Sequence, residues 1–249
     1  GSVPQPIPFW ATLRMQVASS FVSRIAPANT GALAVGVRFL QRAGLPPAGA
    51  AASVGINTVA GFAVHVVLLV GFVAWTGRQG VGRVSLPDAS TVLLVVAGVL
   101  AASGIVVVAV PSLRRKVLPS AVEQVRTAVG SLAGVVTCPW RVFALLGGSL
   151  GVTLSYIAAL AATVEAFDGG LSISQIGAAY LVASAIGSVA PTPGGLGALE
   201  AALISGLTLY GMPDTRAVAA VLTFRLLTFW LPILPGWLVF QRMQANDEL

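Results

Sequence analysis

Charge is what this sequence lacks most: Asp, Glu, Lys and Arg make up only 9% of its 249 residues, against 56% hydrophobic residues. A water-soluble domain carries roughly a quarter charged residues, and a protein core cannot absorb so large an apolar excess. Most of the surface must therefore face lipid, and the chain is expected to be a multi-pass protein of the cell membrane.

The residues that build most catalytic centres are also scarce. A single cysteine, Cys138, excludes an internal disulfide, and with only one histidine, His65, zinc has no ligand set. The sequence holds no G-x-x-x-x-G-K-[ST] element for ATP, and no D-x-D or exposed carboxylate cluster for a metal-bound nucleotide sugar. We therefore expect no cofactor, no metal ion and no ATPase activity of its own.

The net charge of +6 comes from 14 basic residues, of which only Lys116 is a lysine. Their longest run, Arg114–Lys116, is too short for a nucleic-acid-binding tract, so no nucleic-acid partner is expected. In a membrane protein a basic excess follows the positive-inside bias, and here the loops divide into a basic and an acidic set. The basic side, with the C-terminus, is predicted to be cytoplasmic. It holds Arg42, Arg114, Arg115, Lys116, Arg126, Arg141, Arg242 and Glu123; the other side holds Arg78, Arg83, Arg216, Asp88, Glu165, Asp168 and Asp214.

Several stretches are apolar enough to span a bilayer, which takes about 20 residues. A basic, mixed segment at 111–140 is predicted to be an amphipathic surface helix. Tryptophans lie near span ends, where interfacial anchors are found; they are Trp75, Trp140 and Trp237. The predicted spans are roughly 50–75, 90–110, 141–166 and 216–240.

Two further apolar regions, 8–43 and 172–211, each contain two pieces of about 15 residues, too short to cross comfortably. Turns rich in Pro and Gly join the pieces, which is typical of re-entrant helical hairpins that enter and leave on one side. Irregular backbone at membrane depth survives only where protein or a water-filled cavity surrounds it. We therefore predict an all-α membrane fold with two re-entrant hairpins and about four full spans.

Proline and glycine residues occur in the same order in the two hairpin regions. IAPANTGALAV (Ile25–Val35) is similar to VAPTPGGLGAL (Val189–Leu199), and GLPPAGAAASV (Gly44–Val54) is similar to GMPDTRAVAAV (Gly211–Val221). Three full spans separate the hairpins, so the repeat should be inverted, an architecture found in transporters. The predicted organisation is one transmembrane domain over 1–249, with repeats at 8–76 and 172–241 and connecting spans at 90–166.

The second break, APTPGGLGALEAAL (Ala190–Leu203), carries most of the candidate site. Its glycines allow unusual backbone conformations and leave amide groups free for an anion at the new helix start. Glu200 either satisfies the helix dipole there, pairs with an intramembrane arginine, or takes up a proton on a transport pathway. The other residues assigned to this break are Pro191, Pro193, Gly194, Gly195 and Gly197.

Three arginines in apolar surroundings are the candidate phosphate ligands: Arg24 and Arg38 flank the first break, and Arg225 lies about ten residues into the last span. A guanidinium fork suits phosphate better than a lysine does. The alternative is that these arginines only neutralise Glu200 or cap carbonyl groups.

Two other features were weighed as functional. His65 lies within a span, where it either bonds a neighbouring helix or titrates along the transport pathway. Gly147–Gly151 reads GGSLG and formally matches the G-x-S-x-G nucleophile motif, which needs a strand–turn–helix setting. Inside a span, small residues at this spacing form a packing face, so no catalytic residue is assigned.

APTPGGLGALEAAL followed by LTFRLLTFWLPILPG resembles the closing motifs of the transmembrane domain of the lysylphosphatidylglycerol synthase/flippase family. The family's Pro-Gly-Gly-Leu-Gly element and its glutamate match Pro193–Gly197 and Glu200, and its aromatic-Arg pair matches Phe224-Arg225. SRIAPANTGALAVGVRFLQRAGL is similar to the first re-entrant element, with Arg38 at its arginine. The acidic residue and Pro-Gly-Arg of that element are missing here, so no carboxylate role transfers to the first hairpin.

The resemblance implies movement of an anionic or lipid-linked head group between leaflets, with a membrane lipid as the partner. The family usually has further spans before the first hairpin, so this chain is expected to be a fragment. A homo-oligomer or a partner domain outside the chain fits the same expectation. We expect a flippase rather than an enzyme; the alternatives are a membrane transferase using a lipid-linked donor, or a structural subunit of a partner enzyme.

Overall fold

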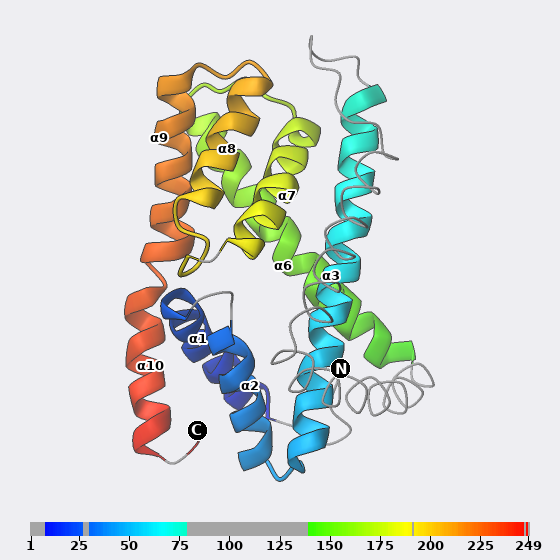
Figure 1. Cartoon of the computed structure of the whole chain (residues 1–249), viewed down its shortest axis with the longest axis vertical. Coiled ribbons are helices and arrows are strands. Elements are labelled where there is room, and N and C mark those ends of the chain that lie inside the picture. Colours follow the sequence, from blue (N-terminus) through cyan, green and yellow to red (C-terminus); the bar gives the residue numbers. More distant parts are fainter. Residues whose placement is uncertain (1–7, 27–29, 79–138, 191, 247, 249) are drawn as a thin grey trace, which may run out of the picture.

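A computed structural model describes residues 8–26, 30–78, 139–190, 192–246 and 248, and within them the chain is helical (Figure 1). The span expected at 90–110 lies outside these residues, as does the amphipathic helix expected at 111–140 apart from its last two residues. The helices are α1 (Phe9–Ile25), α2 (Thr30–Arg42), α3 (Pro47–Arg78), α6 (Pro139–Ala166), α7 (Ile173–Val189), α8 (Ala198–Leu209), α9 (Asp214–Arg225), the π-helix η1 (Leu226–Trp230) and α10 (Ile233–Ala245).

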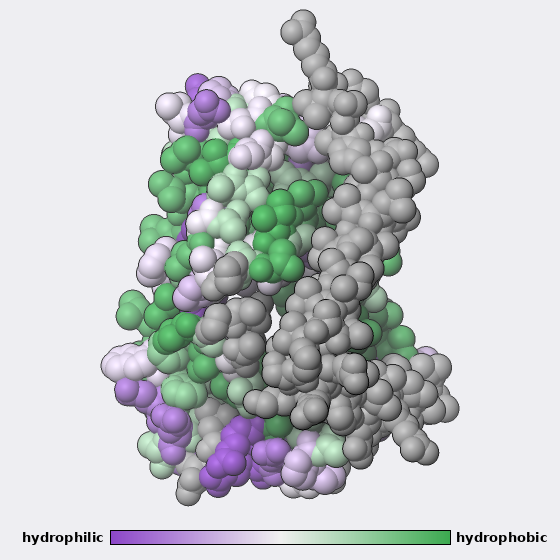
Figure 2. Space-filling view, viewed as in Figure 1, coloured by the Kyte–Doolittle hydropathy of each residue, from purple (hydrophilic) through white to green (hydrophobic). Residues whose placement is uncertain are grey.

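Among the described residues, three helical stretches are long and apolar enough to cross a membrane: Pro47–Gly77, Pro139–Ala166 and the broken helix Asp214–Ala245. They coincide with three of the four predicted spans, so the prediction of an all-helical membrane protein is confirmed. Their outward side chains are apolar, and Figure 2 shows hydrophobic surface between more polar ends of the molecule. Trp75, Trp140 and Trp237 are all exposed on this surface, where the interface would hold their rings.

The two predicted hairpins are present as paired helices. α1 packs on α2, and α7 packs on α8. The hairpins point in opposite directions, with the α1–α2 pair in the lower half of the molecule and the α7–α8 pair in the upper half (Figure 1). α1 and the described part of the second hairpin turn come together near the middle of the molecule, where Arg24 of α1 and Gly194 line one cavity.

The first helix of each hairpin ends in the same way. α1 ends at Ile25 and α7 at Val189, and the next residues, Ala26 and Ala190, are both extended with ψ of 138° and 134°. A proline follows each alanine in the sequence. The ring of a proline disfavours helical backbone in the residue before it, so the sequence itself stops both helices at matching positions.

One glycine after each chain reversal, Gly31 in the first hairpin and Gly195 in the second, lies very close to the preceding helix. A Cβ atom on Gly31 would lie 2.7 Å from the carbonyl oxygen of Val22, and one on Gly195 would lie 2.8 Å from that of Gly187. Gly31 and Gly195 occupy the same position when the two repeat segments are aligned. A side chain at either residue would force the two helices of its hairpin apart.

The turns that follow α2 and α8 are also equivalent. Gly44 and Gly211 have positive φ, 92° and 101°. Their amides bond the carbonyls three residues back, and the next amides, of Leu45 and Met212, bond the carbonyls five residues back. This is the hydrogen-bond pattern of a Schellman helix end, in which glycine is favoured because it adopts positive φ without strain. Both turns lead through proline into a long apolar helix.

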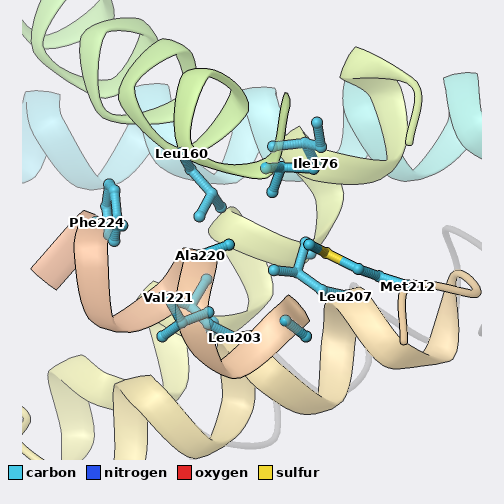
Figure 3. Packing of buried hydrophobic residues seen from close by; sticks show 12 residues of the cluster. Leu160, Ile176, Leu203, Leu207, Met212, Ala220, Val221 and Phe224 are labelled. Carbon is cyan, nitrogen blue, oxygen red and sulfur yellow. The ribbon is translucent and has the colours of Figure 1, made fainter. Parts of the chain in front are cut away.

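Each hairpin packs on the long helix of the other repeat. α1, from the first hairpin, packs on α10, and α7, from the second, packs on α3. The upper half has its own core between α6, α7, α8 and α9, which includes Leu160, Leu203, Leu207 and Phe224, each no more than 1% exposed (Figure 3). This packing fixes the second hairpin against α9 and so places Glu200 beside Arg225.

Candidate anion site

A cavity of about 260 Å³ lies between α1 of the first hairpin and the turn of the second hairpin. That volume is well above the roughly 10–15 Å³ that one water molecule needs. Residues of α1, α6, α7, α8, α9 and η1 and of the second hairpin turn surround it, so the cavity exists only when both hairpins are in place. Its lining consists of Ser20, Ser23, Arg24, Tyr156, Tyr180, Gly194, Leu199, Phe224, Arg225, Thr228 and Phe229.

Glu200 and Arg225 form a close ion pair, with 2.5 Å between Arg225 Nε and Glu200 Oε1. Only 7% of the arginine side chain and 17% of the glutamate side chain are exposed. Arg225 also donates from Nη2 to the carbonyl oxygen of Gly194, at 3.4 Å. A charge at this depth needs a partner, and Glu200 and the turn of the second hairpin supply it.

Glu200 also caps its own helix. Its Oε2 accepts a hydrogen bond of 2.7 Å from the amide of Gly197, the residue before α8 begins. Gly197 has no side chain, so this is only the carboxylate half of a capping box. Both structural roles considered for Glu200 therefore hold together: one oxygen satisfies the helix start and the other pairs with Arg225.

Arg24 reaches the same cavity from the other repeat. It donates through Nη1 to the carbonyl of Ser20 and through Nη2 to the carbonyl of Thr228, the latter at 2.7 Å. The Thr228 carbonyl would bond the amide of residue 232 in a regular helix, but residue 232 is proline and has no N–H group. Pro232 thus leaves a carbonyl without its regular helical donor, and Arg24 satisfies it.

The ring of Phe229 lies against both guanidinium groups, 4.3 Å from Arg225 Cζ and 5.6 Å from Arg24 Cζ. Cation–π contacts of this kind hold the planar groups without using their hydrogen-bond donors. Arg24 Nε is buried and bonds nothing among the described residues. Of the side chains lining the cavity, the two arginines are cationic and none is acidic, and Glu200 beside it balances one of them.

The glycine-rich break differs from expectation in its amide groups. The N–H of Gly195 donates to the carbonyl of Thr192 at 3.1 Å, so it is not free to bind an anion. Gly194 presents its carbonyl to Arg225, and a Cβ atom there would lie 2.3 Å from the Phe229 ring. The glycines therefore shape the cavity by leaving space, while the positive charge comes from arginine.

Some predicted site residues lie elsewhere. Arg38 is exposed on α2 and is not part of the cavity, so the structure does not bring it together with Arg24 and Arg225. His65 Nε2 lies 3.1 Å from the carbonyl oxygen of Leu181, a bond between α3 and α7. Pro193 is exposed in the turn, and Pro191 lies outside the described residues.

Several lining residues were not predicted. Tyr156 and Tyr180 stack at 6.0 Å between ring centroids, and Phe224 meets both rings edge-on. Their positions in uniformly apolar helices gave no sequence signal. Thr228 could have been found, because Pro232 four residues later leaves its carbonyl without a helical partner.

Ser149, in the GGSLG segment, lies inside α6 and donates to the carbonyl of Leu145 at 3.1 Å. A Cβ atom on Gly61 of α3 would lie 3.9 Å from its hydroxyl oxygen. Ser149 therefore lies toward α3, whereas a Cβ atom on Gly147, Gly148 or Gly151 would meet nothing within 4 Å among the described residues, so these glycines show no close helix contact there and the predicted packing face stays a prediction.

Comparison with known proteins gives one match. A family model described as "Lysylphosphatidylglycerol synthase TM region" matches residues 1–236 of the chain. No curated protein and no solved structure matches it. The match covers both hairpins and all the residues that line the cavity.

Proposed function

The chain belongs to the family of the lysylphosphatidylglycerol synthase transmembrane region, and on this premise we propose that it moves a lipid with an anionic, phosphate-bearing head group between the leaflets of a membrane. The observation that carries the proposal is the cavity between α1 and the second hairpin turn, where two arginines are accompanied by a single carboxylate. No ATP-binding element is present in the sequence, so movement would follow a gradient.

The charge of the cavity favours an anion. Arg24 and Arg225 together carry two positive charges, and Glu200 carries one negative charge, which leaves a surplus of one. A phosphodiester carries one negative charge, so a bound head group would neutralise the site. The hydroxyl group of Tyr156 lines the same space and could donate a hydrogen bond to a phosphate oxygen, whereas Ser20 and Ser23 donate theirs to the carbonyls of Val17 and Ser20.

The arrangement of the hairpins supports a transport role. If both are re-entrant, they enter from opposite leaflets, and the cavity lies where each leaflet's half of the path ends. The matched turns at Gly31 and Gly195, and at Gly44 and Gly211, support an inverted repeat. Broken helices that meet near the midplane at a repeat interface are the usual location of a transporter's binding site.

Leaflet exchange by the purified protein tests the proposal directly. We expect liposomes containing the protein and a fluorescent phosphatidylglycerol analogue to lose the protected inner-leaflet signal on addition of a membrane-impermeant quencher. Protein-free liposomes should retain the signal. Exchange should occur without any new lipid product on thin-layer chromatography. A covalent product would instead identify a transferase, and absence of exchange across phosphate-bearing lipids would contradict the proposal.

Arg24 and Arg38 form a matched pair of variants on the first hairpin. Arg24→Gln should slow exchange by about 10–100-fold, because hydrogen bonds to charged groups contribute roughly 1.5–3 kcal/mol each. Arg38→Gln removes an equal charge from an exposed site outside the cavity and should leave the rate within about twofold. Equal loss in both variants would show that surface charge, and not the cavity, governs exchange.

Orientation can be tested with single cysteines. The ends of α2 and α10, which carry Arg42 and Arg242, lie at one end of the molecule, and the start of α9 lies at the other (Figure 1). In a Cys138→Ser background, Ala43→Cys should react with an impermeant maleimide only from the cytoplasmic side, and Thr215→Cys only from outside. Labelling of both cysteines from one side would contradict the inverted repeat.

A further inference from the structure

A second, smaller cavity of about 140 Å³ lies beside the break in the second hairpin. It shares Gly194 and Leu199 with the arginine-lined cavity, so the two spaces are neighbours. Its chemistry is different, because its polar side chains are the neutral hydroxyls of Ser184, Ser188 and Thr192. The remaining lining residues are Gly187, Ala190 and Gly195.

The hydroxyl oxygens of this cavity are placed to accept rather than to donate. Ser184 donates its proton to the carbonyl of Leu181 at 3.1 Å, and Ser188 donates to that of Ala185 at 2.7 Å. Both oxygens therefore keep lone pairs for another ligand. Thr192 Oγ1 is buried and bonds nothing in the described part of the chain. A buried hydroxyl without a partner costs free energy unless something at the site satisfies it.

The backbone adds oxygen ligands of the same kind. α7 ends at Val189, beside the cavity, and the C-terminal end of a helix carries a partial negative charge. The carbonyl of Gly187 has no helical donor, because residue 191 is proline and lacks an N–H group. Gly195 lies against this carbonyl, and a Cβ atom on residue 195 would be only 2.8 Å from the carbonyl oxygen.

We propose that this cavity binds an alkali-metal cation, Na⁺ or K⁺, through the hydroxyls of Ser184, Ser188 and Thr192 and the carbonyl of Gly187. Calcium and magnesium sites usually include carboxylate ligands, and no Asp or Glu lines this cavity. Neutral hydroxyl and carbonyl oxygens at the end of a broken helix are the ligands that transporters use for monovalent cations.

The position of the site gives the cation a role that rests on the proposed function. A cation at the hairpin break would lie next to the anion cavity, with Gly194 between them. Binding of the cation would stabilise the turn that supplies the Gly194 carbonyl to Arg225. A cation gradient could then supply the driving force for movement of the head group.

Equilibrium binding of ²²Na⁺ to the purified protein in detergent, without added lipid, tests the site itself. We expect saturable binding in choline chloride buffer, competed by unlabelled Na⁺ or K⁺. Thr192→Val keeps the shape and removes the hydroxyl, and should weaken binding by about 10–100-fold, the range typical of changes at metal sites. Thr208→Val is the matched control, because the Thr208 hydroxyl bonds its own helix on an exposed face.

Absence of saturable ²²Na⁺ binding to the wild-type protein together with absence of an effect of K⁺ on its thermal stability would overturn the proposal, as would equal binding by Thr192→Val. Lipid exchange assayed in parallel separates this inference from the proposed function. Exchange without cation binding rejects the cation site and leaves the flippase proposal standing. Cation binding without lipid exchange rejects the flippase proposal and leaves the cation site standing.

Discussion

Arg225→Lys is expected to give a folded protein that exchanges lipid about 10–100-fold more slowly than the wild type. Lysine keeps the positive charge, so Glu200 keeps a counter-ion and the fold survives. An ammonium group cannot bond Glu200 and the Gly194 carbonyl while presenting a planar face to Phe229, as the guanidinium does. The loss corresponds to one charge-assisted hydrogen bond of roughly 1.5–3 kcal/mol. Liposome exchange rates, with thermal stability as the folding control, measure it.

The double variant Glu200→Gln/Arg225→Gln separates a ligand from a counter-ion. Arg225→Gln alone should destabilise the protein by about 3–5 kcal/mol, because it leaves a buried carboxylate unpaired, whereas loss of both charges can be nearly neutral. We therefore expect the double variant to be as stable as the wild type and inactive in exchange. An active double variant would show that Arg225 serves only to neutralise Glu200.

Gly195→Ala is expected to destabilise the second hairpin strongly, because both its backbone conformation and a close backbone contact oppose an added methyl group. Alanine in the left-handed conformation that Gly195 adopts, with φ of 68°, costs about 1–2 kcal/mol. Its Cβ would also lie 2.8 Å from the Gly187 carbonyl oxygen, and backbone cannot yield as a flexible side chain does. Overpacking of this kind adds about 1–3 kcal/mol. A fall in melting temperature and in monodisperse yield measures the effect.

Gly211→Ala provides the control for the conformational part of that cost. Gly211 also has positive φ, 101°, but a Cβ atom there meets nothing within 4 Å. It should lose only about 1–2 kcal/mol, and its melting temperature should fall roughly half as far as that of Gly195→Ala. Equal falls in the two variants would mean that the helices of the hairpin do not touch closely at Gly195.

The sequence predicted the helical skeleton well, because prolines and glycines mark its ends. Ala26 and Ala190 each precede a proline, and Gly44 and Gly211 each close a helix, so the limits of both hairpins followed from local chemistry. The pairing of Glu200 with Arg225 was also predictable, because carboxylates are scarce in the apolar stretches of the sequence and Glu200 lies in the one just before the Arg225 helix.

The composition of the cavity was harder to predict. Arg24 and Arg38 look alike in sequence, and only the packing of α1 on α10 and of α2 on α1 and α3 decides that Arg24 enters the cavity while Arg38 is exposed. Tyr156 and Tyr180 come from helices that are apolar on every face, where periodicity cannot identify an inward side. The π-helix after Arg225 inserts an extra residue per turn, which no composition rule anticipates.

The packing of each hairpin on the long helix of the other repeat has a mechanical consequence. α1 packs on α10 in the lower half of the molecule, α8 packs on α9 in the upper half, and α3 contacts both halves through α2 and α7. The long C-terminal helix passes from the upper half to the lower half at η1 and Pro232, where regular α-helical bonding is interrupted. A hinge there would let α10 swing with the first hairpin while α9 stays with the second. Such a swing would strain the bond from Arg24 to the Thr228 carbonyl, so the arginine that lines the cavity would also resist movement of α1 relative to η1.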